Sequence, residues 1–253
     1  MPSAIKTAAE YGDDLTVLFV EVQGASPEKA EQFAWKRKWM GANAIWTTET
    51  PFRIPQQGIP KCALVSSSGE VLLTGRPHEL HKQIEEAIDA DIAARKDGPS
   101  DAPKSLKKHY KALAKGQVGK ALAGANGIVA AAGDDVAAAT ELVESITARV
   151  ERSMARFDTM LAEGMVIEAE EHFDALEKSL KGTDTFAEAL AAKEAALEAA
   201  DKGAAKKLTK IVRALEEDGP SDANVAKLAK FAKKNADGPV GKRARRLLDV
   251  LGG

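Results

Sequence analysis

The chain has 253 residues, enough for one large domain or two ordinary ones. Its formal net charge of −2 argues against a general polyanion-binding protein. Apolar runs are far shorter than the ~20 residues that cross a bilayer, and no signal peptide begins at Met1, so we expect a soluble chain without a membrane span. The single cysteine, Cys62, excludes an intramolecular disulfide and a thiolate zinc cluster.

The first part of the chain alternates helical and strand patterns. A helix is predicted over residues 3–11, and residues 15–22, which read LTVLFVEV, are typical of a strand covered on both faces. Ser26 and Pro27 then supply an N-cap and a first helical residue for a helix that is predicted to reach about Met40.

A hairpin is predicted to follow a short strand over residues 44–48. Gly58-Ile59-Pro60 leads into its two strands, over residues 62–66 and 71–74, and the Ile59-Pro60 bond is either trans or cis. Gly75-Arg76-Pro77 is predicted to open a helix that continues through residue 88. Strand, helix, strand, hairpin and helix define an α/β fold with a mixed sheet.

This order of elements resembles the thioredoxin-like superfamily, in particular its secreted and periplasmic thiol–disulfide oxidoreductases, whose cis-proline loop faces a Cys-x-x-Cys pair. Met1-Pro2 matches a Met-Pro pair that commonly follows those cysteines by about one helical turn. The resemblance implies a thioredoxin-like domain over residues 1–95, truncated before or at its catalytic helix, whose parent protein works outside the cytoplasm without a cofactor. It also implies that Ile59, Pro60 and Lys61 contact a substrate peptide.

The resemblance further implies that the central strand of the sheet is missing between residues 15–22 and 62–66. Without that strand, the two neighbours either pair directly or leave backbone groups unpaired. We expect a slot about one strand wide, ~9–10 Å between strand axes, which an extended peptide could enter by β-augmentation.

Few side chains are candidates for chemistry. Cys62 is either a redox-sensing thiol beside the proline loop or a small buried hydrophobe, and the second reading is favoured because no base adjoins it. His78 and His81 with Glu85 could hold a metal, but nothing supplies further ligands, so we predict no metal site. His109 is isolated in the sequence, as is His172.

The rest of the chain is predicted to be helical. Residues 96–104, which read KDGPSDAPK, form the predicted linker to a helical domain over residues 105–253. An apolar stripe from Val136 to Leu161 predicts one long helix, capped by Asp134 or Asp135. A helix over residues 165–180 is predicted to pair with it in a hairpin that turns at Gly164.

Short motifs recur in this helical part. Residues 97–102, which read DGPSDA, recur as residues 218–223, and a second echo pairs Gly182-Thr183-Asp184 with Asp237-Gly238-Pro239. The pattern resembles degenerate tetratricopeptide-like repeats, which bind proteins or act as spacers. A basic cluster near the C-terminus could bind nucleic acid or anionic lipid, but a solvated helix face is favoured; it comprises Lys227, Lys230, Lys233, Lys234, Lys242, Arg243, Arg245 and Arg246.

Two functions remain as alternatives. The chain is either a thioredoxin-like protein of the thiol–disulfide exchange family, inactive as given because it lacks the cysteine pair, or a non-catalytic binding or scaffold protein that uses its helical tail. Both predict protein or peptide partners and no nucleic acid. The oligomeric state does not follow from the sequence.

Overall fold

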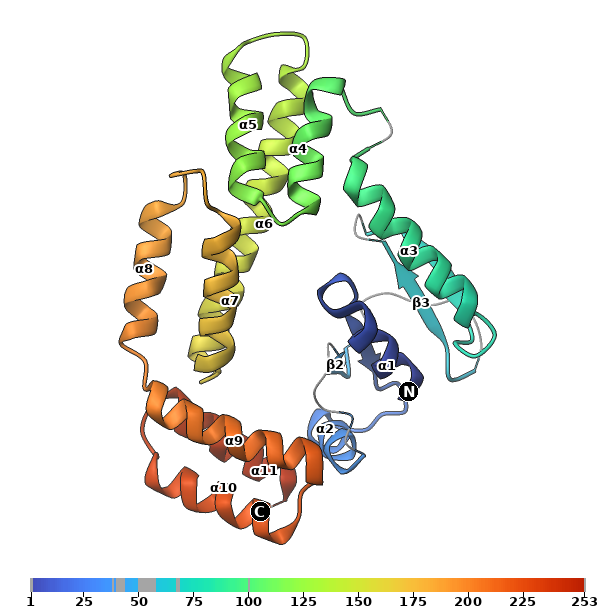
Figure 1. The fold of residues 1–253 in the computed structure, drawn as a ribbon. Helices are drawn as coiled ribbons and strands as arrows, with labels where there is room; N and C mark the ends of the chain where they lie inside the picture. The colour runs from blue at the N-terminus through green and yellow to red at the C-terminus, as the bar shows by residue number, and fades with distance from the viewer. Residues whose placement is uncertain are drawn as a thin grey trace. The chain divides into compact units, whose positions relative to one another are not determined.

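The computed structural model describes residues 2–37, 39, 44–49, 58–66, 69–99 and 101–252. This part of the chain is mostly helical, with eleven α-helices and four short strands (Figure 1). It divides into two compact units. The first comprises Met1–Ala30 with Ala42–Ala102, and the second comprises Glu31–Gly41 with Pro103–Gly253.

The first elements follow the predicted order. They are α1 (Pro2–Tyr11), a 3-10 turn (Gly12–Asp14), β1 (Val17–Val20), α2 (Pro27–Lys36) and β2 (Ala44–Thr47). Ser26 caps α2 as predicted, because its Oγ accepts a hydrogen bond from the Lys29 N–H at 3.4 Å. The helix ends at Lys36, four residues before the predicted end; Met40 itself lies outside the described residues.

The hairpin is formed by β3 (Cys62–Val65) and β4 (Val71–Gly75), and α3 (His81–Asp97) follows it. The prediction that Gly75-Arg76-Pro77 opens this helix is wrong. Gly75 is still in the β-ladder, opposite Cys62, and the Arg76 carbonyl accepts hydrogen bonds from the Glu79 and Leu80 N–H groups in a turn. The helix therefore starts later than predicted and runs nine residues beyond residue 88.

The strands form two separate two-stranded sheets, not the single mixed sheet that was predicted. β1 pairs with β2 in parallel, with Val17 opposite Ala44, and β3 pairs with β4 antiparallel. Among the described residues no strand joins the two ladders, and β1 does not pair directly with β3. A thioredoxin-like fold is therefore not confirmed, because the sheet that would define it is not continuous.

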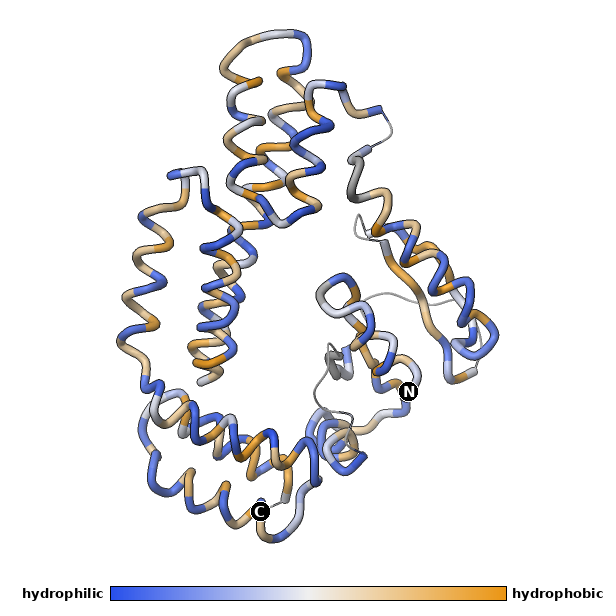
Figure 2. Tube along the Cα trace, in the orientation of Figure 1, coloured by the Kyte–Doolittle hydropathy of each residue, from blue (hydrophilic) through white to orange (hydrophobic). Residues whose placement is uncertain are grey.

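Residues 104–251 form eight helices: α4 (Lys104–Ala114), α5 (Val118–Ala130), α6 (Val136–Ala162), α7 (Val166–Ser179), α8 (Ala187–Glu198), α9 (Lys202–Asp218), α10 (Asp222–Lys234) and α11 (Pro239–Leu251). Hydrophobic residues recur along these helices, as expected of helices that bury one side (Figure 2). The long helix and its hairpin with α7 are confirmed, with Gly164 at the turn in a left-handed conformation, φ 75°. Asp135 does not cap α6 through its side chain; its carboxylate instead accepts a hydrogen bond from the Ser105 hydroxyl.

Two buried clusters hold the helical part together. The α4–α7 core includes Leu106, Leu122, Ile146, Val150 and Met154. The α6–α11 core includes Phe157, Phe173, Leu208, Leu215 and Leu228. The single helix α6 contributes side chains to both clusters: residues up to Met154 pack in the α4–α7 core, and Phe157 packs in the α6–α11 core.

The recurrent Asp-Gly-Pro motif is a structural repeat as well as a sequence repeat. Gly98, Gly219 and Gly238 have φ values of 76°, 84° and 87°, with ψ within 10° of 180° in each case. This backbone region is essentially restricted to glycine. Gly98 and Gly219 are the C-caps of α3 and α9, whereas Gly238 is the N-cap of α11. Each of the three glycines precedes a proline.

Candidate functional site

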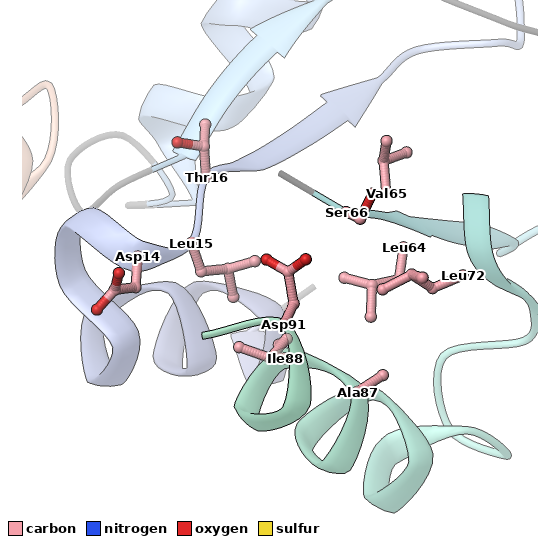
Figure 3. A pocket seen from close by; sticks show the side chains of 10 residues that line it. All are labelled: Asp14, Leu15, Thr16, Leu64, Val65, Ser66, Leu72, Ala87, Ile88 and Asp91. Atoms are coloured by element: carbon pink, nitrogen blue, oxygen red, sulfur yellow. The ribbon is translucent and has the colours of Figure 1, made fainter. Parts of the chain in front are cut away.

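A cavity of about 220 Å³ lies between the β1 and β3 ladders in the first unit (Figure 3). Its walls come from the segment entering β1, from the end of β3, from β4 and from α3. The lining residues are Asp14, Leu15, Thr16, Leu64, Val65, Ser66, Leu72, Ala87, Ile88 and Asp91. The cavity thus adjoins the segment that enters β1 and the edge of the β3–β4 hairpin.

The lining combines apolar side chains with acidic groups. Figure 3 shows the Asp91 carboxylate between Leu15 on one side and Leu64 on the other, with Asp14 at the edge of the view. Ala87, Ile88 and Asp91 share one face of α3 because their spacing matches the helical repeat. The charged side chains of the lining are both carboxylates.

The exposed large hydrophobic side chains of the described residues are concentrated in the first unit, and two of them, Val65 and Leu72, line the cavity. Seven large hydrophobic side chains are exposed in the described part of the chain, and six of them belong to the first unit: Leu18, Val22, Ile59, Val65, Val71 and Leu72. None lies among the described residues of 103–252. In the same unit, Phe19 and Ile88 are the large hydrophobic side chains that are fully buried among those described. The first unit therefore buries its large hydrophobic side chains less completely than the helical part does.

The predicted peptide-binding residues lie outside the lining. The Ile59-Pro60 bond is cis, which confirms one of the two alternatives for that bond. Ile59 and Pro60 are exposed and Lys61 is half-buried, but none of the three borders the cavity. Their predicted contact with a substrate peptide stays a prediction.

Cys62 is a free, half-buried thiol that also lies outside the cavity lining. Burial raises the pKa of this thiol, and a hydrogen bond with the Gly75 backbone lowers it only in part. The thiolate is the reactive form, so this environment opposes nucleophilic chemistry. The geometry therefore favours the packing role of Cys62 over the redox-sensing role.

We expect the chain to show no dithiol oxidoreductase activity, because one cysteine can form a mixed disulfide but cannot resolve it. Because burial raises the pKa of Cys62, its alkylation by iodoacetamide should be slower in the folded chain than in urea and should accelerate at a higher pH. Insulin reduction with dithiothreitol is the companion assay. A rate well above the reagent-only control, abolished by Cys62→Ser, would contradict the first expectation. Equal alkylation rates in the folded and the urea-unfolded chain would contradict the second.

The histidines do not assemble a metal site within the described residues. His81 Nδ1 lies 3.5 Å from Glu85 Oε1, whereas His78 lies beside Glu79 instead. His172 Nε2 lies 2.9 Å from the Ser153 hydroxyl and 2.9 Å from its carbonyl oxygen, so it links α7 to α6.

The C-terminal basic cluster is partly engaged by carboxylates. Arg243 forms an ion pair with Glu168 at 3.1 Å, and Arg246 forms one with Glu31 at 3.3 Å. Among the described helices, none is both long enough and apolar enough to cross a membrane.

Comparisons of the chain with protein-family models, with curated proteins and with solved structures found no match. The cavity must therefore be interpreted from its own residues. The expectation that β1 and β3 do not pair directly agrees with the structure, whereas a slot one strand wide stays a prediction. Sequence reasoning missed the contribution of Asp91, because the helix that carries it was predicted to end at residue 88. The available signal was the continued helical spacing of Ile84, Ile88 and Ile92.

Proposed function

We propose that the first unit is a thioredoxin-like domain without dithiol chemistry, and that it binds an extended polypeptide strand between β1 and β3. The observation that carries the proposal is the cavity between two ladders that do not pair with each other. A strand placed there would lie about 4.8 Å from each neighbour, the ordinary spacing within a sheet. Binding by strand addition draws its affinity from main-chain hydrogen bonds.

The lining suggests which strands would be preferred. Alternate residues of an added strand point to opposite faces, so one set would face Leu15, Leu64 and Ile88. Apolar side chains suit this set because burying them against the lining is favourable. The carboxylate of Asp91 in the lining favours a basic side chain in the same strand. The expected ligand is an extended segment in which apolar residues alternate with polar or basic ones.

The experiment measures binding of a pool of acetylated, fluorescent peptides of about seven residues, the usual strand length. Valine or leucine alternates with lysine or threonine in the pool. A second pool of the same composition carries N-methyl groups on every second backbone amide, which removes donors for the ladder. We expect the first pool to raise fluorescence anisotropy on binding and the methylated pool to bind much more weakly.

Two variants test whether the peptide binds at the cavity. They replace Val65 and Val71, which are opposite each other in the β3–β4 ladder and are both exposed. Val65 lines the cavity and Val71 does not. Val65→Lys should weaken peptide binding by about tenfold or more, since it removes an apolar contact of the added strand and places a cation that competes with the peptide's lysines for Asp91. Val71→Lys should change it by less than about twofold. Equal effects of both variants, or equal binding of the two pools, would refute strand addition at this cavity.

A further inference from the structure

A second cavity, of about 420 Å³, lies against the helical hairpin α4–α5, within the second unit. Its lining contains four lysines and no carboxylate: Lys108, Lys111, Lys115 and Lys120, with His109, Ala112, Gln117 and Gly124. The volume falls within the usual range of small-molecule sites. The cavity is far more basic than the chain as a whole, which carries a net charge of −2.

Positive charge is concentrated in the α4–α5 hairpin, where repulsion between the lysines lowers its stability. Residues 104–130 contain six lysines and no aspartate or glutamate. Lys108 and Lys111 are three residues apart on α4, and Lys115 follows four residues later as its C-cap, so these like charges repel one another. Lys108, Lys115 and Lys120 form no ion pair with any residue that the structure describes. An anion in the cavity would relieve this repulsion.

The wall of the cavity contains a buried polar group. His109 is 93% buried, since its exposed fraction is 7%, and its Nε2 has no hydrogen-bond partner. Its ring lies against Gly124 so closely that a Cβ added there would overlap the ring. Burial lowers the pKa of this imidazole, and the Lys108 ammonium lowers it further. The surroundings of His109 therefore favour its neutral form, and charge placed beside the lysines would change the pKa of this imidazole.

The start of α5 adds to the attraction for anions. Gln117 precedes the helix without capping it through its side chain, and Lys120 is in the first turn. A helix N-terminus carries partial positive charge and free backbone N–H groups, which suit phosphate oxygens. Lysine ammoniums bind phosphate as point charges, whereas planar carboxylate recognition favours arginine, and arginine does not occur in the lining.

We propose that the α4–α5 cavity binds a small molecule that carries more than one phosphate group. The four ammoniums and the α5 N-terminus contact the phosphate oxygens, and Gln117 supplies an amide donor. The hollow lined by His109, Ala112 and Gly124 distinguishes this site from a flat basic surface, which would attract any long polyanion. The proposal does not depend on strand binding by the first unit.

The test is isothermal titration of the full chain with tripolyphosphate, with citrate as a carboxylate competitor of similar charge. The lining double variant Lys108→Gln/Lys120→Gln is compared with Lys104→Gln/Lys107→Gln, which removes two exposed lysines from the same hairpin outside the lining. Both doubles change net charge equally. We expect the lining double to weaken tripolyphosphate binding by about tenfold or more, and the control double by about twofold or less.

The His109 imidazole provides an independent readout by NMR. Bound tripolyphosphate offsets the lysine charges, so the pKa of His109 should rise on addition of tripolyphosphate in the original chain and in the control double, but not in the lining double. Equal losses of affinity in the two doubles would overturn the site, because net charge alone would then explain binding. Citrate binding as tightly as tripolyphosphate would overturn the phosphate assignment. A single-stranded oligonucleotide that binds more tightly and displaces tripolyphosphate would replace it with a nucleic-acid site.

Discussion

Replacement of Phe157 by alanine is expected to lower the free energy of unfolding of the helical part by about 3–5 kcal/mol. The side chain of Phe157 is fully buried in the α6–α11 core. Its ring centroid lies 5.8 Å from that of Phe173, with the ring planes tilted by 52°. Truncation removes this contact and leaves a cavity that rigid helices cannot fill by collapse.

Urea unfolding followed by helical circular dichroism measures the loss. Phe33→Ala is the matched control, because Phe33 is 47% exposed and contacts Trp39 edge-to-face at 5.5 Å between ring centroids. Phe33→Ala should lower the free energy of unfolding by no more than about 1 kcal/mol. Comparable losses in the two variants would contradict the position of Phe157 at the centre of a core.

Substitution by alanine should change the free energy of unfolding in opposite directions at two glycines of α5. A Cβ added at Gly119 would overlap the carbonyl oxygen of Leu180 and lie 2.6 Å from that of Lys181, both of which are backbone atoms. We expect Gly119→Ala to lower the free energy of unfolding by about 1–3 kcal/mol, because the end of α7 must move away from α5.

Gly127 lies on the same helix, and a Cβ there would meet nothing within 4 Å. Gly127→Ala should raise the free energy of unfolding by about 0.5–1 kcal/mol, since alanine loses less backbone entropy in a helix interior. Urea titrations of the two variants give the comparison directly. A gain in stability for Gly119→Ala would mean that α5 and the end of α7 are not in close contact.

The spacing of apolar residues in the sequence predicted those helices that bury one continuous apolar stripe. The apolar spacing from Val136 to Leu161 extends over about seven turns, too long to arise by chance in a loop, and α6 matches it closely. The start of α3 was missed because Gly75-Arg76-Pro77 is compatible with both a helix start and a strand end. Pairing of Gly75 with Cys62 decided between them, and that pairing involves residues thirteen positions apart.

The two candidate sites differ in how far the sequence could predict them. The expectation of a slot between β1 and β3 came from a resemblance in the order of elements, not from residue patterns, and it stays a prediction. The basic cavity could not be predicted, because lysines three and four residues apart on a helix usually face solvent. Its distinguishing feature is the contact of His109 with Gly124, which depends on the packing of α4 against α5.

Because α6 runs without a break through both cores, the rotation of the helix about its axis fixes which side chains face each core. Met154 belongs to the α4–α7 core and Phe157 to the α6–α11 core, less than one turn apart. Each residue added to a helix turns the remainder by about 100°, so a single insertion between them would swing Phe157 away from Phe173. Insertion of seven residues, close to two whole turns, would restore the orientation while separating the cores by about 10 Å. We therefore expect α6 to tolerate insertions or deletions between Met154 and Phe157 only when their length is close to a whole number of helical turns.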